Sequence, residues 1–231
     1  MKRVLFWDID GTLLSTGRAG VFALEEAARE ICGGEVDLAS MKTSGLTDGE
    51  IARAVMEDCG ADTADGQVER FLEAYERHLP ERLHWRQGEV LAGVETILDH
   101  LEGRDDVLNL LLTGNTAAGA KAKLTHYGLA GRFAGGAFCA GYERRDSIAR
   151  RARQSVTEHG ADPERDELYV IGDTPHDVSC GKAIEAITVA VASGTYSAEE
   201  LAESEPSLVL EELPEPDRFE ELVLGLARPR A

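Results

Sequence analysis

The chain has 231 residues, which is enough for one large α/β domain or for a core with a smaller insertion. Its formal net charge is -19, so its electrostatic field repels nucleic acid and anionic membrane surfaces. No apolar run approaches the roughly 18 residues of a membrane helix, and the apolar stretch at the N-terminus is too short for a signal peptide, so we expect a cytoplasmic protein with no nucleic-acid or membrane partner.

Short apolar runs and helical patterns predict the elements in chain order. The first strand covers residues 3–8 and ends before the polar sequence "DIDGT". Helical periodicity without a convincing strand follows, at 19–32, 48–58 and 67–79. Beyond residue 90 helices and strands alternate: a helix at 91–103, a strand at 107–112, a helix at 116–127, a short strand at 136–139, a helix at 145–158, a strand at 168–172, a helix at 175–186, a strand at 187–192 and a weaker strand at 207–210.

This alternation predicts an α/β fold with a doubly wound, mainly parallel Rossmann-like sheet, in which ligands bind at the carboxyl ends of the strands. The helical stretch after the first strand is too long for a crossover loop, so we interpret residues 16–88 as an inserted all-helical cap. Residues 1–15 and 89–231 then form the catalytic core. The glycines placed to act as hinges are Gly17, Gly20, Gly88 and Gly93. The acidic stretch 198–221 is expected to be a solvated face.

The cysteines show no pattern of a metal or disulfide site. No pair has CxxC spacing, and no histidine stands at zinc-ligand spacing from a cysteine. We therefore predict buried free thiols at all four positions, which are Cys32, Cys59, Cys139 and Cys180.

Polar residues gather at the predicted strand ends. If the strands are neighbours, several carboxylates converge on one spot, which is costly without a cation. Oxygen ligands without histidine or cysteine favour a hard ion, Mg²⁺ above all. The residues of this predicted cluster are Asp8, Asp10, Thr113, Gly114, Asn115, Arg144, Arg145, Asp173 and Asp177.

The sequences "DIDGTL", "LLLTGNT" and "GDTPHD", with a basic residue before the last, resemble the four motifs of the haloacid dehalogenase superfamily. The resemblance covers essentially the whole chain. Within this superfamily, the chain most resembles the phosphoglycolate phosphatase-like branch, whose helical cap is inserted just after the first motif. It implies a Mg²⁺-dependent phosphatase that forms an aspartyl-phosphate.

The resemblance implies a role for each acid of the first motif. Asp8 is the expected nucleophile, because a carboxylate needs no deprotonation at neutral pH. Asp10 is the expected general acid/base, and both acids are also expected at the metal, Asp10 through its backbone carbonyl. Thr12 is expected to hydrogen-bond this pair.

The second and fourth motifs complete the expected phosphate and metal site. Thr113 and the N–H of Gly114 are expected to bind phosphoryl oxygens, while Asn115 either joins them or caps the next helix. Asp173 is the expected direct metal ligand. Asp177 either holds a metal-bound water or is an acid favoured by the helix dipole.

The third motif departs from the usual pattern, because the superfamily commonly presents a lysine in "KP" there. We expect Arg145 to replace this lysine, with Arg144 as the alternative, since a guanidinium suits phosphate oxygens. Both arginines could instead lie on the surface. A second departure is Ile184-Glu185, where related sequences tend to have Ala-Gly, and we expect it to alter packing.

The cap loop 41–51 resembles a substrate-facing loop. Its side chains Lys42, Thr43, Ser44 and Thr47 are candidates for substrate contact, although Thr47 or Asp48 also suits the N-cap of a helix. Arg18 at the mouth of the cap can meet an anionic substrate or remain in solvent.

The predicted function is hydrolysis of a small phosphorylated metabolite, phosphoglycolate-like in class. A β-phosphoglucomutase-like phosphotransferase is the main alternative, and a catalytically idle interaction domain is a minor one that the intact Asp8, Asp10 and Asp173 disfavour. Asp10 disfavours 2-haloacid dehalogenation, whose members usually lack this second aspartate. A Schiff-base phosphonate hydrolase needs a cap lysine, for which Lys42 is the candidate.

Overall fold

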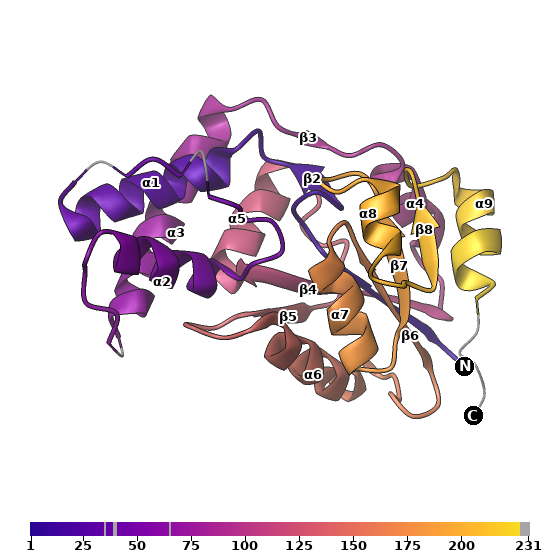
Figure 1. Cartoon of the computed structure of the whole chain (residues 1–231). Helices are drawn as coiled ribbons and strands as arrows, with labels where there is room; N and C mark the ends of the chain where they lie inside the picture. The colour runs from indigo at the N-terminus through magenta and orange to yellow at the C-terminus, as the bar shows by residue number, and fades with distance from the viewer. Residues whose placement is uncertain (35, 39–40, 65, 227–231) are drawn as a thin grey trace.

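The computed structural model describes residues 1–34, 36–38, 41–64 and 66–226. A six-stranded parallel sheet of order β5–β4–β1–β6–β7–β8 forms its centre, with helices on both faces (Figure 1). This confirms the predicted doubly wound Rossmann-like fold. The strands of this sheet are β1 (Arg3–Trp7), β4 (Val107–Thr116), β5 (Gly136–Cys139), β6 (Glu167–Gly172), β7 (Ile187–Val191) and β8 (Leu208–Leu210).

The central strand β1 is apolar from Val4 to Trp7 because both of its faces are covered there. Leu5 and Trp7 belong to the cluster under α4, α5 and α9, whereas Val4 and Phe6 pack with α6 and α7. The helices of the core are α4 (Val94–Leu101), α5 (Ala117–His126), α6 (Arg145–Ser155), α7 (Pro175–Ala183), α8 (Ala198–Ala202) and α9 (Pro216–Phe219). A 3-10 turn at Val156–His159 follows α6, and a π-helical turn at Glu220–Leu224 follows α9.

The helices α1 (Ala19–Cys32), α2 (Asp48–Asp58) and α3 (Gln67–Trp85) pack around a hydrophobic cluster of their own, beside the carboxyl ends of the sheet (Figure 1). α3 runs six residues beyond the predicted end at 79 and passes through Pro80. Leu79 and Leu83 are buried on either side of this proline, so packing outweighs the local cost of proline.

Two short strands missed in the sequence connect these helices to the core. β2 (Leu14–Ser15) pairs with β3 (Glu89–Val90) in an antiparallel ribbon. The two chain segments next to the ribbon also lie close together: a Cβ at Gly17 would lie 2.4 Å from the carbonyl oxygen of Gln87. Gly17 and Gly88 thus lie where the chain leaves the core and where it returns, whereas Gly20 lies within α1 and Gly93 is the N-cap of α4. A hinge function of these glycines stays a prediction.

The acidic side chains of the C-terminal stretch 198–221 are mostly exposed, as expected for a solvated face, and the stretch is also ordered. It contains α8 and β8, and the capping box of Ser197 with Glu200 starts α8. Leu201, Leu213 and Phe219 are buried and anchor the stretch to the sheet and to α4. Within the described ranges, no helix combines the length and the apolar character that a membrane span requires.

The prediction of four free thiols is wrong for two of them. Cys32 at the end of α1 and Cys59 after α2 form a disulfide, with their Cα atoms 6.2 Å apart. Tertiary packing of the helix ends brings the pair together across 27 residues, which local spacing does not reveal. Cys139 and Cys180 are buried free thiols, as predicted.

Candidate active site

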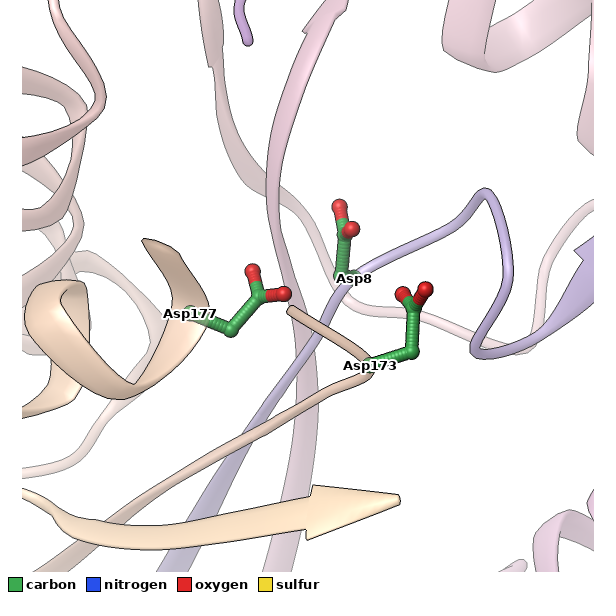
Figure 2. Close-up of side chains that lie close together, drawn as sticks. All are labelled: Asp8, Asp173 and Asp177. Carbon is green, nitrogen blue, oxygen red and sulfur yellow. The ribbon is translucent and has the colours of Figure 1, made fainter. Parts of the chain in front are cut away.

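Three carboxylates meet at the carboxyl ends of β1 and β6. Asp8 follows β1, Asp173 follows β6, and Asp177 lies in the first turn of α7. The side chains of Asp8 and Asp173 lie side by side with Asp177 directed toward them (Figure 2), and one oxygen from each lies within 4.8 Å of the others. The parallel pairing of β1 with β6 places Trp7 opposite Ile171, so both strands end at the same level.

The electrostatics of this triad suit a cation. Burial raises the pKa of Asp8 and of Asp173, and repulsion from Asp177 raises both pKa values further. Among the described residues, Asp8 Oδ1 is a buried oxygen without a hydrogen-bond partner. Closely spaced carboxylate oxygens with an unsatisfied member form a donor set that fits a hard divalent cation.

Arg145 is the cation that the chain itself supplies. Its Nη2 donates to Asp177 Oδ1 and lies 3.4 Å from Asp8 Oδ1. Burial disfavours the charged guanidinium, but Asp177 and Asp8 outweigh this effect and raise the pKa of Arg145. Arg144, in contrast, has a 79% exposed side chain 3.7 Å from Asp146 and lies outside the site. Of the two candidates for the third motif, the fold brings only Arg145 to the carboxylates.

Asp10 has other partners than the triad. Its side chain is 43% exposed, and its Oδ2 accepts from Asn115 Nδ2 at 2.8 Å. Asn115 Nδ2 also lies 2.8 Å from Thr113 Oγ1, so the second motif is tied to the first. The alternative role of Asn115 as an N-cap is wrong, since Thr116 caps α5 by accepting from the N–H of Gly119.

Lys123 is the main site residue that sequence reasoning missed. Its Nζ lies 2.6 Å from Asp10 Oδ2 and 2.6 Å from Asn115 Oδ1, and its side chain is 5% exposed. A signal was present, because Lys123 stands three residues after Ala120 and one before Leu124, both on the buried face of α5. A lysine on such a face needs a partner, and Asp10 provides it.

The loop after β7 also contributes to the site. Ser193 Oγ donates to the carbonyl oxygen of Gly11 at 2.7 Å, and a Cβ at Gly194 would lie 1.8 Å from Asp173 Oδ2. Gly11 has φ +84°, and a Cβ there would lie 2.3 Å from Asp173 Oδ2, so this position requires glycine. Thr12 Oγ1 donates to Asp173 Oδ1 at 3.0 Å. The predicted hydrogen bond from Thr12 to the Asp8–Asp10 pair is therefore wrong.

Asp177 occupies the helix-start position given as its alternative role, because it forms a capping box with Thr174 at the start of α7. It also pairs with Arg145, and its role in holding a metal-bound water stays a prediction. Gly114 lies against the loop that precedes α2, since a Cβ at Gly114 would lie 2.7 Å from the carbonyl oxygen of Leu46.

A cavity of about 380 Å³ lies between these groups and the helices α1, α2 and α3. Thr43, Ser44 and Arg18 line it, and Arg18 has a φ of +70°. Lys42 is exposed and does not line the cavity. Thr47 is the N-cap of α2 in a capping box with Glu50, which confirms the alternative given for it.

The protein thus has a Rossmann-like α/β fold with a cluster of carboxylates at the carboxyl ends of its sheet. Residues 5–182 match the family of haloacid dehalogenase-like hydrolases, and the chain belongs to that family. The predicted resemblance is therefore confirmed. A comparison with the curated proteins finds no match.

Solved structures similar to this chain share its fold over nearly the full length. A predicted phosphatase from Clostridium acetobutylicum is 20% identical, with a TM-score of 0.72 over 97% of this chain and 99% of that chain. A predicted phosphoglycolate phosphatase from Haemophilus somnus is 13% identical, with a TM-score of 0.70 over 95% and 97%. CbbY from Rhodobacter sphaeroides, in complex with phosphate, is 17% identical, with a TM-score of 0.69 over 92% and 95%.

Proposed function

We propose that the protein is a Mg²⁺-dependent phosphatase that hydrolyses a small phosphorylated metabolite through an aspartyl-phosphate on Asp8. The observation that carries this proposal is the buried triad of Asp8, Asp173 and Asp177 against Arg145, with an oxygen of Asp8 left unsatisfied. Such a site has too much negative charge for an anionic substrate unless a cation joins it.

The residues divide the reaction between them. An oxygen of Asp8 attacks phosphorus and the ester P–O bond breaks, while Asp10 gives its proton to the leaving alkoxide. Water then attacks phosphorus, Asp10 takes the proton of that water, and the bond to Asp8 breaks to release phosphate. Bound Mg²⁺, held by Asp8, Asp173 and the Asp10 carbonyl with Asp177 behind them, would supply positive charge at the phosphoryl oxygens.

The phosphoryl group is proposed to bind beside Asp8. The Thr113 hydroxyl, the Gly114 N–H and the Arg145 guanidinium line the same cavity and offer donors to its oxygens. Asn115 holds Thr113 and Asp10 together at this point.

Residues 16–88 are proposed to act as the cap that selects the substrate. Their apolar side chains Val21, Leu24 and Ile51 close the cavity above the carboxylates, with the hydroxyl-bearing Tyr75 beside them. A volume of about 380 Å³ suits a small phosphate ester. Similarity to a predicted phosphoglycolate phosphatase supports a short phosphorylated acid as a candidate substrate.

The test measures phosphate release from 4-nitrophenyl phosphate with Mg²⁺ and with a chelator, for wild type, Asp8→Asn and Asp105→Asn. We expect turnover in wild type and in the variant of the exposed Asp105, only with Mg²⁺, and none in Asp8→Asn. Mg²⁺-independent turnover, or activity retained by Asp8→Asn, would contradict the proposal.

The phosphotransferase alternative is decided by a second assay. Hexose 1-phosphate is supplied with and without a hexose bisphosphate, and both isomerised sugar phosphate and free phosphate are measured. Free phosphate as the dominant product supports the phosphatase, and bisphosphate-dependent isomerisation contradicts it.

A further inference from the structure

We infer that Lys123 is a positioning residue that fixes the carboxylate of Asp10 for proton transfer. The inference rests on the proposed function, because it concerns how the general acid of that reaction is held. It adds a residue outside the four motifs to the machinery of the site.

The geometry is a closed triangle of three side chains. Lys123 Nζ lies 2.6 Å from both Asp10 Oδ2 and Asn115 Oδ1, and Asn115 Nδ2 lies 2.8 Å from Asp10 Oδ2. Each of the three groups contacts the other two, so none of them can rotate without breaking two contacts. Both donors reach Oδ2 of Asp10, which leaves Oδ1 as the oxygen to carry the proton.

Asp10 needs this support because of where it stands. Asp8 is held by burial and by the ends of the strands, but the Asp10 side chain is 43% exposed on the turn after β1. An exposed carboxylate on a turn can rotate freely, and a misplaced general acid loses much of its rate advantage. Lys123 comes from α5, a helix packed on the sheet, and is therefore a rigid support.

Residues of α1, α2 and α3 surround the Lys123 ammonium group. A Cβ at Gly20 of α1 would lie 3.8 Å from Lys123 Nζ and 3.8 Å from Tyr75 Oη. The buried carboxyl of Asp48 at the start of α2 also faces the lysine. These groups leave the Lys123 side chain only 5% exposed, so the lysine end of the ion pair is held away from water.

This role predicts a dependence on the leaving group. Ethyl phosphate must lose a strongly basic alkoxide and depends on the proton of Asp10, whereas 4-nitrophenolate leaves without one. Displacing Asp10 should therefore slow phosphoryl transfer from ethyl phosphate far more than from 4-nitrophenyl phosphate. A purely structural lysine would change both reactions by the same factor.

The experiment compares kcat/KM for the two esters in wild type, Lys123→Met and Lys123→Arg, with Mg²⁺ present. The matched control is Lys121→Met, an exposed lysine on the same helix. In Lys123→Met we expect a loss of about 100-fold for ethyl phosphate and under about 5-fold for 4-nitrophenyl phosphate. Lys123→Arg should recover part of the difference because it keeps the charge, and Lys121→Met should match wild type.

Other outcomes overturn the inference. Equal losses for both esters assign Lys123 to structure, and a higher KM for both with unchanged kcat assigns it to substrate binding. Thermal unfolding of each variant is followed in parallel, and Lys123→Gln replaces Lys123→Met in the same comparison if the latter does not fold. If wild type hydrolyses neither ester, the proposed function itself fails, and this result is distinct from an active wild type with an indifferent Lys123.

Discussion

Asp8 and Asp10 stand two positions apart, and the fold gives them different surroundings. Asp8 is buried against Arg145, whereas Asp10 is part-exposed and paired with Lys123 and Asn115. Different environments for two neighbouring carboxyls are the usual basis for separate catalytic roles. The sequence showed both acids but not the partners that distinguish them, since those partners come from the end of β4, from α5 and from α6.

The third motif yields a sharp comparison between adjacent arginines. We expect Arg145→Ala to lower kcat/KM by about 100-fold or more, because it removes the positive charge beside Asp8. Arg144→Ala should stay within about twofold of wild type, since Arg144 is an exposed surface residue. Steady-state kinetics with 4-nitrophenyl phosphate measure both, and equal effects would contradict the assignment.

Glu185 is strained in its present conformation. It has a φ of +57° after the end of α7, in the left-handed region that favours glycine. The resemblance to the haloacid dehalogenase superfamily leads us to expect glycine at this position, so the departure at Glu185 has a backbone consequence. We expect Glu185→Gly to raise the free energy of unfolding by about 0.5 to 1 kcal/mol in urea denaturation. Glu203→Gly, at a φ of -60°, is the control and should not stabilise the protein.

At the scale of elements, α2 is fastened to the core at its first turn. Asp48 Oδ2 accepts from the N–H of Thr116 at 2.8 Å, and Thr47 Oγ1 donates to the carbonyl oxygen of Glu143 at 2.9 Å. The first bond joins α2 to the end of β4, next to Asn115. Movement of α2 away from the sheet therefore requires breaking hydrogen bonds beside Asn115 and the proposed site.

Burial raises the pKa of Asp48 to about 6. A carboxyl whose pKa is raised on folding contributes stability below its unfolded pKa, near 4, and that contribution is lost as pH rises through 6. Asp48→Asn keeps the acceptor but cannot ionise. We expect wild type to lose about 1 kcal/mol relative to this variant between pH 5 and 7.5 in urea denaturation. Asp58→Asn, at the exposed end of α2, should show no such trend, and a constant difference for Asp48→Asn would contradict the account.

Elements with a strong local pattern were predictable, and elements made by tertiary contact were not. The six strands of the large sheet and the helices at 19–32 and 48–58 follow from apolar periodicity. β2 and β3 have two residues each and form only because the segment that leaves the core lies beside the segment that returns to it. The disulfide of Cys32 and Cys59, and the burial of Leu201 and Phe219, depend equally on packing between distant segments.

The whole molecule repels the substrate that its site is proposed to bind. A net charge of -19 acts on any phosphate ester at long range, whereas Arg145 and Lys123 act only inside the cavity. We expect kcat/KM for a phosphate ester to rise, by about twofold or more, when inert salt increases ionic strength from low to physiological values at fixed free Mg²⁺. A fall in kcat/KM would show that local attraction dominates approach.

Metal binding should stabilise the folded chain as a whole. The carboxylates of Asp8, Asp173 and Asp177 repel one another in the folded protein and are far apart when it unfolds, so a cation that binds them favours the folded state. We expect Mg²⁺ to raise the melting temperature of wild type by several degrees and that of Asp173→Asn by much less. Equal shifts would place the bound ion elsewhere.

The central claim is that Asp8 carries the phosphoryl group during turnover. In the direct test, the enzyme is quenched with acid during hydrolysis of 4-nitrophenyl phosphate in the presence of Mg²⁺, and the modified peptide is then identified by mass spectrometry. We expect a phosphoryl group on Asp8 that is absent without Mg²⁺ and absent in Asp8→Asn. A phosphoryl group on another residue of an active enzyme would contradict it.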